Sequence, residues 1–223
     1  MREDPAELFD LAEKRLADLA PLDQSAEWNA IRGSLFKKRA STLIGDAQRE
    51  ELRRSMDAYR AAVRVNNPLE SADVHLDVYH SSLTLLMAYA LGWPDDAPIR
   101  ETYLERLALQ KASYDPEAGD YWERARIADI NAAEIVTGGR LIKEPDRQDL
   151  VQGFVNAFRV RSTMRNRSSV IDNYRDLGLL LPSKKLREAA LRVAKDLEEF
   201  RPPRVARPGA APTGSAGTGA GVP

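Results

Sequence analysis

The chain contains two histidines, His75 and His80, and no cysteine. Successive residues of an α-helix are rotated by about 100°, so a spacing of five places the two imidazoles about 140° apart around the axis. A histidine pair that shares a metal on one helix has a spacing of four. We therefore expect no metal site, with His75 near a helix start and His80 at a polar edge of a helical hairpin. The absence of cysteine excludes disulfides, thiolate metal sites and cysteine nucleophiles.

Carboxylates precede the second histidine. Glu70, Asp73 and Asp77 lie within ten residues of His80, and paired acidic groups beside a histidine can act as general acid and base. Glu70 and Asp73 also suit the first turn of a helix, where they supply a cap and favour the helix dipole. We favour the capping interpretation, and no glycine-rich phosphate loop is present. The chain is therefore expected to be no enzyme and to carry no cofactor.

Basic residues gather in two places. Lys37, Lys38 and Arg39 are consecutive, and a run without an intervening acid contains Arg159, Arg161, Arg165 and Arg167. Guanidinium groups bind phosphates and carboxylates with two parallel hydrogen bonds, so this run is a candidate site for an anionic small molecule or nucleotide. The competing interpretation is a solvated face whose partners are nearby carboxylates, namely Asp146, Asp149, Asp172 and Asp176. Aromatic residues do not alternate with these arginines, which disfavours binding of single-stranded nucleic acid.

Three tryptophans could anchor a protein interface. Trp28 and Trp122, the second with Tyr121 beside it, stand at helical spacing, which predicts packing in the core. Trp93 lies between Gly92 and Pro94, in a turn where burial is less assured.

Charge and hydropathy exclude several classes of protein. The 33 basic and 34 acidic residues give a net charge of -1, so no overall field attracts nucleic acid or an anionic membrane. The most apolar stretch, residues 83–91, is far shorter than the roughly 20 residues that cross a bilayer. The charged N-terminus does not resemble a secretory signal. We expect a soluble cytoplasmic protein with no membrane partner, and nucleic acid is an unlikely partner.

Apolar residues recur three and four positions apart in every long segment, which predicts helices and no strands. The first five helices are expected at about 5–20, 24–44, 47–66, 72–91 and 98–113. The sixth begins near Gly119 and ends at Gly138-Gly139, and the seventh starts at Pro145. A break near residues 162–167 precedes the eighth, and the ninth follows Pro182-Ser183.

The helix from 24 to 44 has two adjacent apolar stripes, which requires neighbours on both sides. Short connections and about nine helices predict an all-α, tetratricopeptide-like α/α solenoid of antiparallel helices. The solenoid is expected over residues 1–200. Residues 201–223 hold many prolines and glycines and no acidic residue, so we expect a disordered tail.

Part of the tetratricopeptide pattern is present on the second and third predicted helices. Gly33 would let two helices approach closely while Phe36 and Tyr59 fill the space between them. The pattern comprises Trp28, Ile31, Gly33, Phe36 and Ala40, followed by Ala58, Tyr59 and Ala62. The two groups are farther apart than in a standard repeat, which predicts an elongated hairpin.

A more specific resemblance rests on four short segments in order. These are Gly33-Ser34-Leu35-Phe36-Lys37-Lys38-Arg39-Ala40, Asp115-Pro116, Tyr121-Trp122 and Gly139-Arg140-Leu141. Over roughly residues 24–200 the chain resembles a bacterial tetratricopeptide-repeat-containing module that is similar to the TRAF-binding region of eukaryotic MAP kinase kinase kinases. The resemblance implies a non-catalytic interaction role in a bacterial signalling or conflict system.

These observations together predict a scaffold or adaptor that binds a protein or peptide. Stacked hairpins form a concave face from alternate helices, the second, fourth, sixth and eighth. The polar positions that we expect to contact the partner are Lys37, Arg124, Asn131 and Arg165. The alternative is a regulatory domain that binds an anionic small molecule through the arginine run.

Overall fold

The computed structural model describes residues 5–20, 25–66, 78–93, 99–117, 119–160 and 162–200. These residues form nine α-helices, one 3-10 helix and no strand. The all-helical prediction is confirmed for the described residues. The helices are α1 (Pro5–Leu19), α2 (Ala26–Ala40), α3 (Gly45–Asn66), α4 (Val78–Ala90), α5 (Ile99–Ser113), α6 (Tyr121–Thr137), η1 (Arg140–Ile142), α7 (Glu144–Phe158), α8 (Met164–Leu180) and α9 (Lys184–Glu199). The predicted start of the fourth helix and the predicted tail lie outside the described residues.

Hydroxyl and carboxylate side chains begin four of the helices. Each accepts a hydrogen bond from a backbone N–H of the first turn, which has no partner within its own helix. The four caps are Ser25 on Trp28, Asp120 on Glu123, Thr163 on Asn166 and Ser183 on Leu186. The cap at Thr163 ends the break between α7 and α8, which spans residues 159–163 and therefore begins before the predicted range of 162–167.

The second helix ends earlier than its sequence predicts. We expected α2 to continue to Gly45, but it ends at Ala40, and Gly45 instead begins α3 with a φ of 65°. Two hydroxyls replace the helical bonds at this end: Ser41 Oγ donates to the Lys38 carbonyl at 2.7 Å and Thr42 Oγ1 to the Arg39 carbonyl at 2.8 Å. Side-chain bonds of this kind compete with the helix, so the turn begins four residues sooner.

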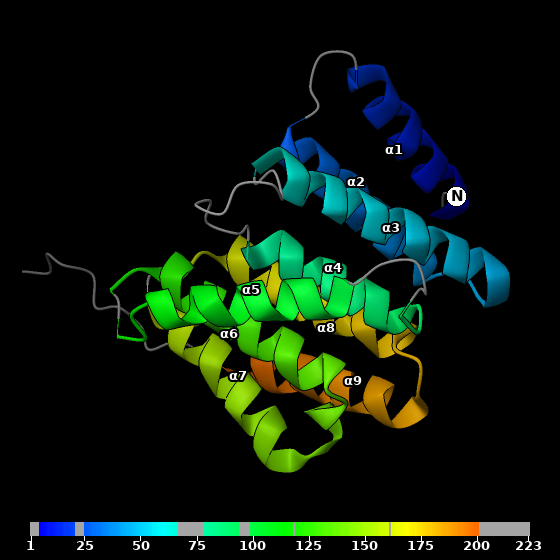
Figure 1. The fold of residues 1–223 in the computed structure, drawn as a ribbon. Helices are drawn as coiled ribbons and strands as arrows, with labels where there is room; N and C mark the ends of the chain where they lie inside the picture. Colours follow the sequence, from blue (N-terminus) through cyan, green and yellow to red (C-terminus); the bar gives the residue numbers. More distant parts are fainter. Residues whose placement is uncertain are drawn as a thin grey trace, which may run out of the picture.

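The helices pack as neighbouring antiparallel pairs arranged in layers (Figure 1). α1 lies at one end of the molecule and packs on α2, which pairs with α3. α3 packs on α4, α4 on α5 and α6, and α6 on α7. At the other end α9 packs on both α7 and α8, and α8 also reaches back to α2. The first and last hairpins of the chain are therefore in contact.

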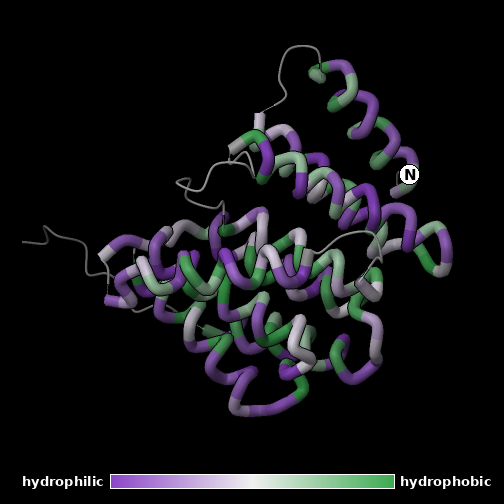
Figure 2. The backbone as a smooth tube through the Cα atoms, in the orientation of Figure 1, coloured by the Kyte–Doolittle hydropathy of each residue, from purple (hydrophilic) through white to green (hydrophobic). Residues whose placement is uncertain are grey.

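Hydrophobic residues are concentrated in the middle of this arrangement. α4 is buried nearly all round, and its hydrophobic residues lie mainly in its C-terminal half (Figure 2). α1 instead alternates between hydrophilic and hydrophobic residues and has no buried residue. Two leucines of this helix, Leu8 and Leu19, are exposed, and so is Ile31 of α2.

The close approach of α2 and α3 is confirmed. A Cβ atom at Gly33 would lie 2.8 Å from the ring of Tyr59, which is fully buried beside it. Ser55 Oγ donates to the Gly33 carbonyl at 2.8 Å, and the Tyr59 hydroxyl lies 3.0 Å from Ser34 Oγ. Phe36 is buried, as the sequence predicts. Glycine at position 33 is therefore what allows a tyrosine to fit between the two helices.

Candidate partner-binding surface

Lys37 was expected on an open face of α2, but the structure buries it. Its side chain is 4% exposed and lies 3.6 Å from Asp176 Oδ2 on α8, and its Nζ also donates to Asn173 Oδ1. Lys38 approaches the same carboxylate from the solvent side, at 2.8 Å from Asp176 Oδ1. A partner therefore cannot reach Lys37 without separating α2 from α8. The residue joins two helices instead of facing a groove.

Tyrosines and a histidine from other helices surround this ion pair. Burial lowers the pKa of Lys37, and the charge of Asp176 opposes that shift. Tyr79 on α4 hydrogen-bonds with Asn173, and its pKa is raised by burial. The Tyr79 ring packs edge-on against His80, with ring centroids 5.2 Å apart. The predicted polar edge at His80 is thus part of a largely enclosed cluster.

A second acid of this cluster, Asp129, is partly buried on α6. Burial raises the pKa of Asp129 to about 8. Burial also raises the pKa values of Tyr79, Tyr121 and Tyr174, and the negative charge of Asp129 raises each of them further. Side chains of the second, fourth, sixth and eighth helices therefore come together around polar groups of the protein itself, whereas we predicted that these helices form a concave face for a partner.

The Lys37–Asp176 pair is closed to solvent. A lysine with a lowered pKa is a kind of group that acts in proton transfer. Lys37 and Asp176 are each only 3% exposed, so a substrate could not reach their charges in the folded domain. Buried ion pairs of this kind also occur as purely structural links. We therefore assign this pair to the fold.

The other residues expected at the partner face have separate surroundings. Arg124 Nη2 donates to the Glu117 carbonyl at 3.0 Å, in the loop before α6. Asn131 is partly buried on α6, and Arg165 is exposed in the first turn of α8. In contrast to Lys37, none of these three residues is buried.

Two members of the arginine run pack on the end of α9. Arg167 Nη2 donates to the Phe200 carbonyl at 2.6 Å, and its guanidinium lies 5.7 Å from the centroid of the Phe200 ring. Arg159 lies 5.8 Å from the same ring centroid. Arg161 is outside the described residues.

Three of the four carboxylates expected to neutralise this run are engaged elsewhere. Asp146 pairs with Arg140, Asp172 with Arg175, and Asp176 with the two lysines. In the described part of the chain, Arg159, Arg165 and Arg167 have no ion pair with a carboxylate.

The burial of the tryptophans differs from the prediction. Trp122 was expected in the core, but it is 58% exposed, while its neighbour Tyr121 is buried. Trp93 is partly buried in its turn, where its ring meets Tyr89 at 5.8 Å and lies 5.6 Å from the Arg100 guanidinium. Trp28 is partly buried near α1, and its Nε1 donates to the Leu16 carbonyl at 3.3 Å.

Trp28 belongs to a surface that was not predicted from the sequence. On α2 the Arg32 guanidinium lies 4.6 Å from the ring centroid of Trp28 and 5.6 Å from that of Phe36. On α3 the Arg54 guanidinium lies 4.0 Å from the centroid of Phe36. Arg39, one turn beyond Phe36, completes this surface toward α1 through its contacts with Asp10 and Glu13. We call Trp28, Arg32, Phe36, Arg39 and Arg54 the arginine–aromatic face.

Two cavities open on this face. One, of about 190 Å³, lies between α1 and α2 and is lined by Glu13, Leu16, Ala17, Ala20, Trp28, Arg32, Leu35 and Phe36. The other, of about 230 Å³, lies between α2 and α3 and is lined by Arg32, Phe36, Arg54, Asp57, Ala58 and Ala61. Because both include Arg32 and Phe36, they form one extended surface. The spacing of four between Trp28, Arg32 and Phe36 could have indicated it, since such residues share one side of a helix.

Metal-binding and membrane-spanning features are absent from the described residues. No group of three or more His, Asp or Glu side chains there is arranged to hold a metal ion, and His75 lies outside them. None of the described helices is both long enough and apolar enough to span a bilayer. Comparisons with protein-family models, with curated proteins and with solved structures find no match for this chain.

Proposed function

We propose that this chain is a non-catalytic scaffold that binds a protein partner through the arginine–aromatic face. The observation that carries the proposal is Arg32, which stands over two aromatic rings beside both cavities. In the described part of the chain it has no carboxylate partner. Tryptophan and arginine are the residues most enriched among the energetic anchors of protein interfaces. A guanidinium on an aromatic ring is also available to a carboxylate of a partner.

The size and lining of the cavities favour a peptide or helix over a small molecule. Pockets that enclose a small ligand measure about 300–1,000 Å³, whereas the two cavities measure about 190 and 230 Å³. Each suits a single large side chain. The two cavities lie on either side of Arg32 and Phe36 of α2 and fit neighbouring side chains of a partner segment, as in the recognition of a helix in a groove.

We also propose that the helices form a tetratricopeptide-like solenoid that closes on itself. The side-by-side packing of α2 with α3, α6 with α7 and α8 with α9 supports repeated hairpins. The contact between α8 and α2 supports closure, which moves the binding surface from the interior to the N-terminal end. The sequence resemblance to bacterial tetratricopeptide-containing modules supports an adaptor role in signalling or conflict systems.

Site-specific photo-cross-linking tests the proposed function. A benzoylphenylalanine at Leu35, which lines the first cavity, is expected to capture a partner that the same probe at the exposed Leu109 of α5 does not. The captured partner, purified, should bind the wild-type chain and lose about tenfold or more in affinity with Arg32→Glu, as for a central interface anchor.

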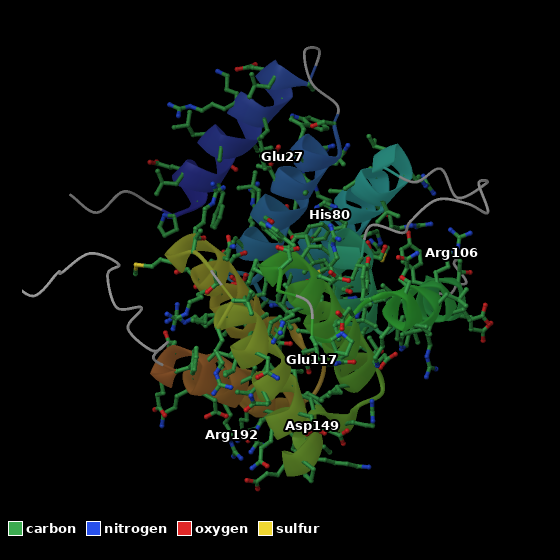
Figure 3. All side chains as sticks on the ribbon, turned by 90° about the vertical axis from the view of Figure 1, so that its left-hand side faces the viewer. Glu27, His80, Arg106, Glu117, Asp149 and Arg192 are labelled. Carbon is green, nitrogen blue, oxygen red and sulfur yellow. The ribbon has the colours of Figure 1, made fainter. Side chains whose placement is uncertain are left out.

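Arg192→Glu is the matched control, because Arg192 is an exposed arginine of α9 at the opposite end of the molecule from α1 (Figure 3). Equal binding by the Arg32→Glu and Arg192→Glu variants would contradict the proposal.

A second candidate function is the binding of an anionic small molecule by Arg159, Arg165 and Arg167. It is favoured by the lack of carboxylate partners for these arginines within the described residues. A nucleotide that binds the folded state raises the unfolding temperature by mass action. The candidate predicts such a rise in a thermal-shift assay with ATP, and its loss in Arg165→Ala, where the exposed arginine makes no packing contribution. No shift at millimolar ATP would eliminate it.

A further inference from the structure

α1 is attached to the domain mainly through polar contacts. It has no buried residue, and Leu8, Leu11 and Leu19 are each at least 47% exposed. The Asp10 and Glu13 carboxylates of α1 lie 2.8 and 3.0 Å from the Arg39 guanidinium, and Glu13 also pairs with Arg54. Partly exposed ion pairs of this kind contribute little to stability. α1 is therefore held weakly in comparison with the other helices.

The fit of α1 to the surface beneath it is incomplete. A cavity of about 190 Å³ remains between α1 and α2, with Ala17 and Ala20 as two of its walls. The cavity opens to solvent beside α1, and a helix with larger side chains at the positions of these alanines would fill it. In Figures 1 and 3 α1 lies at the edge of the molecule, outside the packed layers.

The charges and apolar side chains at the contact between α1 and the arginine–aromatic face indicate which kind of partner this face would bind. Two arginines, Arg32 and Arg54, stand over the rings of Trp28 and Phe36. The third arginine, Arg39, lies toward α1 and shares Glu51 with Arg54. α1 meets this positive, aromatic surface with two carboxylates three residues apart, and Leu16 lies beyond them at the cavity wall. Residues at i and i+3 share a side of a helix, so an amphipathic helix with this pattern is complementary to the face in charge and in hydropathy.

We propose that α1 is an internal, displaceable ligand that covers a docking site for a partner's acidic amphipathic helix. The partner helix has two carboxylates three residues apart and apolar side chains larger than alanine on either side. This inference rests on the proposed function and specifies its partner. Removal of α1 exposes Trp28, Arg39 and Arg54, and the incoming helix then takes over the ion pairs that Asp10 and Glu13 release.

Competition by the α1 sequence itself tests this proposal in the full-length chain. The probe is a fluorescein-labelled peptide of residues 4–20, measured by fluorescence anisotropy. In the variant Asp10→Arg/Glu13→Arg, the α1 of the chain is repelled by Arg39 and Arg54 and no longer competes. We expect this variant to bind the wild-type peptide at least tenfold more tightly than the wild-type chain does.

A charge-matched control removes the simpler explanations. Glu7→Arg/Asp18→Arg changes the charge of α1 by the same amount at two exposed positions that make no ion pair in the described structure. This control should bind the peptide as weakly as the wild-type chain does. Adding Arg32→Glu and Arg54→Glu to the first variant should abolish binding. Hydrogen exchange should increase within residues 5–19 of the first variant and remain unchanged in α6 and α9, which shows that the domain is intact.

Three outcomes would overturn the proposal. Equal peptide binding by the wild-type chain and the Asp10→Arg/Glu13→Arg variant would mean that the face is open beside α1; it would leave the proposed function standing. Peptide binding by neither chain, with the cross-linked partner still bound at Leu35, would mean that α1 does not mimic that partner. A dimer of the wild-type chain in light scattering, lost in the same variant, would assign the face to α1 of a second copy.

A fourth outcome separates the inference from the proposed function. If the peptide binds as expected but no partner is cross-linked at Leu35, α1 is a displaceable helix and the proposed function is contradicted.

Discussion

Lys37 on α2 and Asp176 on α8 form an ion pair of 3.6 Å in which both side chains are at most 5% exposed. The pair connects the first complete hairpin of the chain to the last one, and α2 and α8 otherwise make few contacts. Two charges removed from water in this way are costly unless they are paired. Sliding of α8 against α2 would leave the Lys37 ammonium buried without its counter-charge, so we infer that the pair favours the observed arrangement of the two helices.

Asp176→Asn is expected to lower the free energy of unfolding by about 3–5 kcal/mol, because it leaves the Lys37 ammonium buried without its counter-charge. Lys37→Met/Asp176→Leu should cost much less than the single substitution, since it removes both charges. Urea unfolding at neutral pH measures the unfolding midpoints of the wild type, the single variant and the double variant.

Lys38→Ala is the control: the Lys38 side chain is 45% exposed in its contact with the same carboxylate, so a loss of stability below about 1 kcal/mol is expected. A loss with Asp176→Asn no greater than that with Lys38→Ala would show that the pair does not hold the stack together.

Gly33→Ala should destabilise the domain by about 1–3 kcal/mol through overpacking. The added Cβ would lie 2.8 Å from the Tyr59 ring, which is fully buried and has no space to move. Gly153 provides the matched control on α7, because its Cβ would meet Ala128 Cβ at an ordinary 3.6 Å. Gly153→Ala should leave stability unchanged or raise it by up to about 1 kcal/mol, since alanine favours a helix over glycine. Thermal unfolding of both variants distinguishes a steric effect at position 33 from the general effect of helical glycine.

Helix positions and local packing could be predicted from the sequence because their causes are local. Apolar spacing and side-chain caps predict the nine helices, and Gly33 with Tyr59 predicts the close approach of α2 and α3. The end of α2 was predicted wrongly at Gly45, since the hydroxyls of Ser41 and Thr42 end the helix first. A glycine marks a turn, but it does not say on which side of the turn the helix lies.

The candidate surface could not be predicted because it depends on distant contacts. Lys37 looks like a surface residue until Asp176 is placed beside it by the closing of α8 on α2. The leucines of α1 predict burial, yet only one margin of that helix has a neighbour. Arg32 is one of many charged residues in the sequence, and only the position of its guanidinium over two rings distinguishes it.

Asp129 should make stability fall as the pH rises. Its pKa is about 8 in the folded state, against an ordinary aspartate value of 3.8 in the unfolded chain. Between these two pH values the folded chain therefore keeps a proton that the unfolded chain has released. Stability is therefore highest at the acidic end of this window and declines toward pH 8, with a slope of up to about 1.4 kcal/mol per pH unit. Asp129→Asn should remove this slope. Urea unfolding of both proteins at pH 5, 6, 7 and 8 measures it.

The comparison with Asp129→Asn isolates this group from the others that titrate. The lowered pKa of Lys37 acts in the opposite direction, since it favours the folded state as the pH rises. Both proteins retain Lys37, so its contribution cancels in the difference between them. Parallel pH profiles for the wild type and Asp129→Asn would refute the raised pKa.

Arg167 and Arg165 differ in what they do for the fold, although they are two residues apart. Arg167 donates to the Phe200 carbonyl and packs on the rings of Phe158 and Phe200, so it fastens the end of α9 to the start of α8. Arg167→Ala should cost about 1–3 kcal/mol, the range for a charge-assisted hydrogen bond with a cation–π contact. Arg167→Lys keeps the charge but loses the planar stacking, so its stability should lie between those of the wild type and Arg167→Ala. Arg165→Ala, at an exposed position, should change stability by less than about 0.5 kcal/mol.

Hydrogen exchange distinguishes the two arginines directly. Exchange should increase at the C-terminal turn of α9 in Arg167→Ala alone. Equal protection in the two alanine variants would mean that the arginine run is a solvated face with no structural role.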